Sequence, residues 1–261
     1  MVKNKMAVKK LKALIFDIDG TIADTERDGH RVAFNQAFEE SGLDWNWSIE
    51  LYGKLLSVTG GKERMGYYLD HFNQDYKKPD DLDGFIAELH KLKTQHYTQL
   101  MSRGNIPLRP GVERLLTEAR ETGIRLAIAT TTTPKNVEVL FTHTLGMESL
   151  DWFDVIAAGD IISSKKPASD IYDYALTKLG LAADNCLALE DSHNGLLSSL
   201  GANLKTIVTV NEYTREHDFS GASLVLNHLG EPDMANKILA GSQNCYNYVD
   251  INCCREIVGN E

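Results

Sequence analysis

Two carboxylates, Asp17 and Asp19, directly follow the apolar run 13–16, and Gly20 and Thr21 come next. Ligands of open α/β sheets bind beyond the carboxyl ends of the strands, so these acids lie where a site is expected. Two acids at this spacing suit a hard divalent cation bound through oxygen atoms, and Mg²⁺ is the predicted ion. A polar turn at a strand end, without any chemical role, is the alternative interpretation.

Three further groups follow predicted strands in the order of the chain. They are a hydroxyl at Thr130, a lysine before a proline at Lys166–Pro167, and an acidic pair at Glu190 and Asp191. Together with the acids at 17 and 19, this order resembles the four motifs of the haloacid-dehalogenase-like phosphotransferases, and it spans residues 13–192. Each motif alone is weak, whereas the four in order are specific.

The resemblance gives Asp17 the role of nucleophile, because a carboxylate can attack phosphorus and form an aspartyl phosphate. It makes Asp19 the general acid toward the leaving alkoxide and then the general base toward water. Dehalogenase members lack an acid at this position, so dehalogenation is not expected. Lys166 would add a cation beside the nucleophile, and Thr130 a hydroxyl donor. A solvated surface lysine is the alternative for Lys166, and Lys165 lies next to it.

The resemblance also implies Mg²⁺ as the cofactor. It places the ion on Asp17, on the main-chain carbonyl of Asp19 and on Asp191, with help from Glu190. An ionised nucleophile repels a phosphate dianion, so the site needs the positive charge that Mg²⁺ supplies.

Short β-rich runs alternate with helical patterns along the chain, which predicts a doubly wound, Rossmann-like parallel α/β sheet. The runs are apolar without alternation, as in sheets that helices cover on both faces. Residues 112, 115, 116 and 119 make one apolar helical stripe, and residues 171, 174, 175 and 179 make another. The expected strands are 13–16, 126–129, 155–157, 187–189 and 207–210, with 223–226 as a shorter sixth.

The runs 13–16 and 126–129 are separated by far more chain than the roughly dozen residues that a simple crossover needs. Residues 28–103 have helical patterns and are predicted to form an inserted helical cap domain. The α/β core would then comprise residues 1–27 and 104–230, and residues 231–261 would form a C-terminal helix and a loosely attached tail. Caps of this kind close over a site and exclude water.

The segments 23–35, 59–64, 129–137 and 153–160 narrow the resemblance to the CbbY group, within the subgroup that includes β-phosphoglucomutase. The CbbY group comprises phosphatases of Rubisco-bearing organisms. They remove the 1-phosphate of xylulose 1,5-bisphosphate, an inhibitory by-product, and leave xylulose 5-phosphate. The resemblance therefore implies a small sugar phosphate as the substrate, most specifically this bisphosphate.

A bisphosphate substrate gives a chemical reason for a second cationic site in the cap. Gly60 and Gly61 can expose main-chain N–H groups, and Lys62 and Arg64 can clamp a distal phosphate. A glycine turn that opens a helix with two ordinary surface cations is the alternative. The other residues expected to contact the substrate are Glu26, His30, Thr131, Thr132, Ser192 and Asn194.

Glu26 and His30 lie next to the predicted hinge, where they can hydrogen-bond sugar hydroxyls. The segment 25–30 is one residue longer than in the mutase, so His30 need not superpose on that enzyme's cap histidine. A helix residue that faces solvent is the alternative for His30.

The chain has 261 residues, of which 43% are hydrophobic, and a formal charge of −10. A negative net charge does not favour electrostatic binding of nucleic acid. No apolar run is long enough to span a membrane. The lysines at 9, 10 and 12 break the core of a signal peptide, so we expect a cytoplasmic protein, and a monomer. A plastid protein without its transit peptide would look the same.

The four cysteines do not form a disulfide framework. Cys186 lies in an apolar run and is expected to be buried in a strand. Free thiols are expected at Cys245, Cys253 and Cys254 near the C-terminus, with a metal site or a redox switch as the alternative.

Two other functions remain open. A phosphomutase of the β-phosphoglucomutase type would share the acids, Mg²⁺ and the cap, but would return the phosphoryl group to a sugar. A catalytically silent binding protein on the same fold is the second alternative. Loss of Asp17 or Asp19 would favour it, and both are present.

Overall fold

The runs predicted as strands form one mixed sheet in the computed structural model, which describes residues 11–104, 106–241 and 247–259. In these residues the sheet has seven strands in the order β3-β2-β1-β4-β5-β6-β7, parallel except for β7. The fold class predicted from the sequence is confirmed, and β7 is the strand that was not predicted. The strands are β1 Ala13–Phe16, β2 Arg125–Thr130, β3 Phe153–Ala158, β4 Cys186–Glu190, β5 Lys205–Thr209, β6 Leu224–Leu226 and β7 Ile238–Gly241.

Helices cover both faces of the sheet because each central strand is apolar on both sides. In β1, Leu14 and Phe16 pack into one hydrophobic cluster, while Ala13 and Ile15 pack into the other. The helices of the core are α5 Val112–Glu121, α6 Pro134–Thr144, α7 Asp170–Leu179 and α8 His193–Gly201, with short turns η2 Met147–Trp152, η3 Gly159–Ile161 and η4 Ala183–Asn185.

The stripe predicted at residues 112, 115, 116 and 119 is buried as expected. In α7, Tyr174 is half-buried and packs against the hydrophobic cluster of the predicted stripe, while Tyr172, which was not predicted, is fully buried. The buried face of α7 is wider than the predicted stripe because the helix packs against both the sheet and α8.

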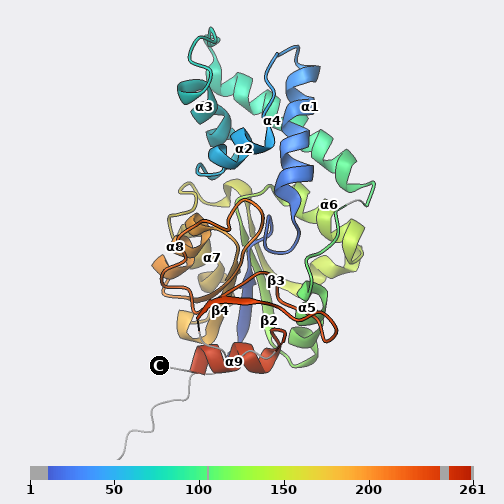
Figure 1. Ribbon diagram of the computed structural model, residues 1–261, viewed down its shortest axis with the longest axis vertical. Coiled ribbons are helices and arrows are strands. Elements are labelled where there is room, and N and C mark those ends of the chain that lie inside the picture. Colours follow the sequence, from blue (N-terminus) through green and yellow to red (C-terminus); the bar gives the residue numbers. More distant parts are fainter. Residues whose placement is uncertain (1–10, 105, 242–246, 260–261) are drawn as a thin grey trace, which may run out of the picture.

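Residues 26–101, between β1 and α5, form helices that stand beyond the carboxyl ends of the strands (Figure 1). They pack around a separate, largely aromatic cluster that includes Phe34, Phe38, Trp45, Trp47 and Tyr52. We call residues 28–103 the cap; its division from the core as a domain stays a prediction. Its elements are η1 Glu26–His30, α1 Arg31–Glu40, α2 Ile49–Leu55, α3 Gly61–His71 and α4 Leu82–Met101.

The chain enters and leaves the cap through two neighbouring antiparallel segments. Ala23 and Leu108 form a β-bridge, and the Arg109 amide donates to the carbonyl of Ile22 at 2.8 Å. Arg109 is 7% exposed, and its guanidinium donates mainly to backbone carbonyls, besides the Thr209 hydroxyl at 3.3 Å and an ion pair with Asp24 at 3.4 Å. Its carbonyl acceptors are those of Gly20, Thr209, Val210 and Asn227.

The described part of the C-terminal segment is packed on the core, so the expectation of a loose tail is wrong there. Strand β7 pairs with β6, and α9 (Ile251–Gly259) lies at the end of the sheet opposite the cap (Figure 1). Val249, Ile251 and Ile257 are buried in the main core.

Cys186 and Cys254 are free and buried, as expected for Cys186. Cys253 is disulfide-bonded, so the expectation of a free thiol is wrong for that residue. Cys245 lies outside the described residues. Of the helices in the described ranges, none is long and apolar enough to cross a bilayer.

Replacing Phe38 by alanine is expected to lower the free energy of unfolding by about 3–5 kcal/mol, because it empties the centre of the cap cluster. Trp45 and Trp47 pack edge-to-face against this ring, with centroids at 5.2 and 4.9 Å, so their fluorescence reports the loss during urea denaturation. Phe72→Ala is the matched control, since Phe72 is 43% exposed in the same cap. Equal losses in both variants would contradict a packed cap cluster.

Candidate active site

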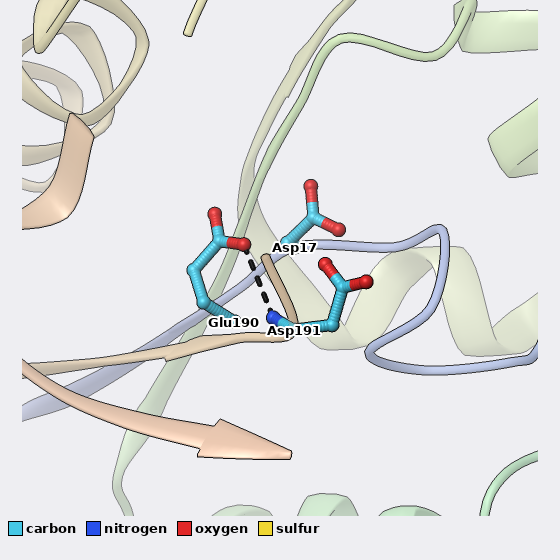
Figure 2. Close-up of side chains that lie close together, drawn as sticks. All are labelled: Asp17, Glu190 and Asp191. Carbon is cyan, nitrogen blue, oxygen red and sulfur yellow. Dashed lines mark hydrogen bonds between the residues drawn. The ribbon is translucent and has the colours of Figure 1, made fainter. Parts of the chain in front are cut away.

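Three buried carboxylates meet at the carboxyl ends of adjacent strands. Asp17 follows β1, Glu190 ends the neighbouring strand β4, and Asp191 comes next (Figure 2). One oxygen from each lies within 4.8 Å of the others, which makes the group able to hold a metal ion. Thr130, the last residue of β2, borders the same cavity from the other side of β1. The sequence prediction of one shared edge therefore agrees with the geometry.

Lys166 reaches into this cluster from the loop before α7. Its ammonium donates to Asp17 Oδ1 at 2.7 Å and to Glu190 Oε1 at 2.5 Å, and the side chain is buried. Lys165 points elsewhere and donates to Asp160 and to the Gly159 carbonyl. The geometry thus distinguishes the two lysines and places Lys166, as expected, beside the candidate nucleophile.

The site holds more negative charge than the protein itself neutralises. Burial raises the pKa of Asp17 to about 8, with a further contribution from Glu190, although Lys166 acts in the opposite direction. Burial, Asp17 and Glu190 together raise the pKa of Asp191 well above its ordinary value. Three buried carboxylates share one ammonium, so their oxygen atoms can bind a hard divalent cation, which prefers oxygen ligands.

The loops around Asp191 hold it in place. Asn211 Nδ2 donates to Asp191 Oδ2 at 2.6 Å. Gly20 has φ +92°, and a Cβ there would overlap both the Asp191 carboxylate and the Asn211 amide. Glycine is therefore required at this turn for steric as well as backbone reasons.

Asp19 belongs to a second network that reaches into the cap. Its Oδ1 accepts from Thr25 Oγ1 at 2.5 Å and lies 2.8 Å from His30 Nε2. Lys93 Nζ lies 2.7 Å from the other ring nitrogen, His30 Nδ1. A charged ammonium can only donate, so Nδ1 accepts from Lys93, and Nε2 faces the Asp19 carboxylate as a close contact without hydrogen-bond alignment. Tyr97 stacks on the His30 ring at 4.3 Å.

This network sets the charge of Asp19. Burial alone would raise the pKa of Asp19, but His30 and Thr25 outweigh it and lower the pKa to about 2. Burial lowers the pKa of Lys93 to about 8, against the attraction of Asp19 and Glu26. The predicted solvent-facing alternative for His30 does not hold, because its ring is 4% exposed.

The predicted cap residues fall into two groups. Glu26 accepts from Tyr52 at 2.5 Å, and Arg64 donates to the same hydroxyl at 2.8 Å. Glu26 and Arg64 line the cavity that holds Asp17 and Asp19. Lys62 instead pairs with Asp160 of the core at 2.6 Å and lines another cavity.

Gly61 borders both the cavity of Lys62 and a further one that contains Arg64, Lys93 and Asp19. Lys62 and Arg64 are therefore not brought together as the predicted two-cation clamp requires. The clamp stays a prediction in which Lys62 would have to exchange Asp160 for phosphate.

The remaining predicted residues line the same cavities, and Thr132, Ser192 and Asn194 among them already have protein partners. Ser192 Oγ accepts from the Gly195 amide at the start of α8. Asn194 Nδ2 donates to Ser57 O and Thr59 Oγ1 of the cap, so it joins cap and core. The cavities are bordered by Thr131, Thr132, Ser192 and Asn194.

Several site residues were missed from the sequence: Lys93, Arg109, Tyr172 and Asn211. Lys93 carried a signal, because it falls at i+4 between Leu89 and Tyr97 on the buried face of α4. Asn211 follows β5 and becomes a site residue only because the loop after that strand folds toward Asp191.

Comparison with known proteins finds related sequences and folds. The family model described as haloacid dehalogenase-like hydrolase matches residues 11–203. The chain is 46% identical over 222 residues to Protein CbbY of Cupriavidus necator, covering 85% of this chain and 87% of that protein. It is 50% identical to Protein CbbY of Rhodobacter capsulatus, covering 82% and 91% of the two chains.

A crystal structure of CbbY from Rhodobacter sphaeroides in complex with phosphate superposes with a TM-score of 0.78 at 46% identity, covering 84% of this chain and 94% of that one. A mutant of the same protein was crystallised with xylulose-(1,5)bisphosphate. A β-phosphoglucomutase from Clostridium difficile superposes with a TM-score of 0.67 over 82% and 90% of the chains, at 24% identity, which shows a shared fold.

Binding of Mg²⁺ to the metal-free protein at pH 7 is expected to release about one proton from Asp17 and a further contribution from Asp191, because both carboxylates have raised pKa values and must ionise to bind. The raised pKa of Asp17, about 8, means that below pH 8 this group keeps a proton that the metal displaces. The release should therefore fall as the pH rises above 8. Calorimetry in buffers of different ionisation enthalpy measures it, and proton-neutral binding at pH 7 would contradict the assignment.

Proposed function

We propose that this chain, which belongs to the haloacid dehalogenase-like hydrolases and is a sugar phosphatase, depends on Mg²⁺ and acts on xylulose 1,5-bisphosphate. The proposal follows from its similarity to CbbY proteins. The products would be xylulose 5-phosphate and inorganic phosphate. The observation that carries this proposal is the placement of Asp17, Lys166 and Asp19 under the cap, in a chain similar to one crystallised with that bisphosphate.

In the first step, Asp17 would attack the phosphorus atom of the 1-phosphate. An Asp17 oxygen–phosphorus bond forms, and the bond from phosphorus to the sugar oxygen breaks. Lys166 donates to Oδ1 of Asp17, and Oδ2, which accepts only a long 3.5 Å hydrogen bond from Thr21, would make the attack. Positive charge fixed beside the transferring group stabilises the charge that develops on it.

In the same step, Asp19 would protonate the leaving sugar oxygen. It can carry that proton when the phosphate dianion adds negative charge beside it, since a nearby like charge raises a carboxyl pKa. In the second step Asp19 must be ionised, and His30 and Thr25 favour that state. It then takes a proton from the water that attacks phosphorus and restores Asp17.

Asp17 and Asp191 would hold Mg²⁺ together with the main-chain carbonyl of Asp19, with Glu190 beside them. When bound, the ion supplies charge neutralisation between the nucleophile and the phosphoryl oxygens. Glu190 has two donors on Oε1, from Lys166 and Tyr172, so the side chain is fixed by the protein itself.

The cap would supply the binding energy for the rest of the sugar bisphosphate. Two buried cations, Arg64 and Lys93, border a cavity that also reaches Asp19. With a net charge of −10, the protein needs such local cations to draw in an anionic substrate. Contacts from Asn194 to the cap and from Lys62 to Asp160 close the cavity over the site.

Phosphate release measured with Mg²⁺ from xylulose 1,5-bisphosphate, ribulose 1,5-bisphosphate, glucose 1-phosphate and fructose 1,6-bisphosphate tests the proposal. We expect strong preference for the first substrate. Asp17→Asn is the near-isosteric control and should lower kcat by at least about a thousandfold, as removal of a nucleophile does.

Even activity across the panel would contradict the substrate while leaving the chemistry in place. Isomerised sugar phosphate without net phosphate release would favour the phosphomutase. Full activity of Asp17→Asn would remove that residue from the role of nucleophile.

Arg64→Ala is expected to raise KM for the bisphosphate by about tenfold or more, the cost of one charge-assisted hydrogen bond. Lys62→Ala should raise it less, because Lys62 pairs with Asp160 rather than facing the cavity of Asp17. Hydrolysis of a small aryl phosphate should change little in either variant. Lys91→Ala is the control, because Lys91 lies on the exposed face of α4. Equal increases of KM in Lys62→Ala and Arg64→Ala would support the two-cation clamp instead.

A further inference from the structure

Tyr172 stands directly behind the reacting groups, in a place that the proposed steps do not use. The residue comes from the first turn of α7 and is 0% exposed. Its hydroxyl donates to Glu190 Oε1 at 2.6 Å, and the Lys166 ammonium lies 5.2 Å from the centre of its ring. One side chain thus contacts both partners of the Lys166–Glu190 ion pair.

The surroundings of Tyr172 are otherwise apolar. Tyr172 belongs to a hydrophobic cluster whose members also include Ile15, Ala129, Ile171 and Ala188. A buried hydroxyl costs free energy unless it is hydrogen-bonded, so its orientation is fixed by the bond to Glu190.

Glu190 is held just as firmly from its other side. Oε1 accepts from both Lys166 and Tyr172, while Oε2 accepts from the Asp191 amide at 3.3 Å. A Cβ on Gly195 would overlap the carboxylate, so the backbone of α8 closes the space behind it. The carboxylate therefore cannot turn, and the strength with which it attracts Lys166 depends on its remaining donors.

The Lys166 ammonium is shared between Glu190 at 2.5 Å and Asp17 at 2.7 Å. A donor on Glu190 Oε1 withdraws negative charge from that oxygen and so weakens its hold on Lys166. Without the hydroxyl, Glu190 would attract the ammonium more strongly and draw it away from Asp17. The nucleophile and the transferring phosphoryl group would then lose part of their nearest protein cation.

We propose that Tyr172 is a positioning residue, which acts through Glu190 to hold the Lys166 ammonium against Asp17. This inference rests on the proposed function, because Asp17 is the nucleophile in that proposal. It concerns the rate of phosphoryl transfer and not the binding of the sugar, which Tyr172 does not contact.

Tyr172→Phe tests the proposal, since it removes the hydroxyl and keeps the ring. We expect kcat, and the rate of aspartyl-phosphate formation in rapid-quench experiments, to fall about tenfold, the lower end of losses for outer-shell partners of ligating groups. KM for xylulose 1,5-bisphosphate should stay within about twofold of the unchanged protein. Tyr174→Phe is the matched control, because Tyr174 is half-buried on the same helix and its ring lies beside Lys178.

A second measurement needs no metal or substrate. The NMR signal of the Lys166 ammonium, recorded in metal-free protein with ¹⁵N-labelled lysine, should shift in Tyr172→Phe and stay in place in Tyr174→Phe. In a Glu190→Gln background, Tyr172→Phe should have a much smaller effect on kcat, since the two residues act through one bond.

Wild-type kcat in Tyr172→Phe with an unmoved Lys166 signal would overturn the proposal. A lower melting temperature with unchanged kcat would show that Tyr172 only packs, which also overturns it. Failure of the unchanged protein to release phosphate from any sugar phosphate would instead contradict the proposed function, and the Lys166 signal would still test the positioning.

Discussion

The ammonium of Lys166 is the contact on which the rest of the site depends. It joins Asp17 at the end of β1 to Glu190 at the end of β4, two carboxylates that would otherwise repel each other in a buried space. The sheet places the strand ends side by side, and α7 carries Tyr172 behind them. The remaining excess of negative charge explains why the cluster suits a divalent cation and why burial raises the pKa of Asp17.

Core and cap divide the chemistry between them. The core holds Asp17 with groups from β1, β4 and the loop before α7. All of these groups belong to the core, so their arrangement does not depend on the position of the cap. Asp19 is controlled from the cap, because His30 and, through it, Lys93 contact its carboxylate. The proposed acid–base group is therefore fully assembled only when the cap lies against the core, which would link proton transfer to exclusion of water.

Much of this arrangement was predictable because parallel strands end at one edge of a sheet. That geometry predicts from the sequence alone that Asp17, Thr130 and Asp191 lie close together. Lys93 was missed because a lysine on a helix is usually solvated, and its burial depends on aromatic rings from other helices. Arg109 and Asn211 depend on how loops meet in space, which the spacing of residues along the chain does not contain. The choice of Tyr172 over Tyr174 required knowing that α7 is covered on two sides.

The two chain segments that enter and leave the cap form a short antiparallel ribbon, joined by the Ala23–Leu108 bridge and the Arg109–Ile22 hydrogen bond. A flat ribbon bends easily across its plane and resists bending within it, so the cap has one soft direction of travel. Groups next to the ribbon, such as His30, then move along a shorter arc than groups at the far rim. A rotation of the cap about this ribbon would therefore widen the outer mouth of the cavity more than the space around Asp19.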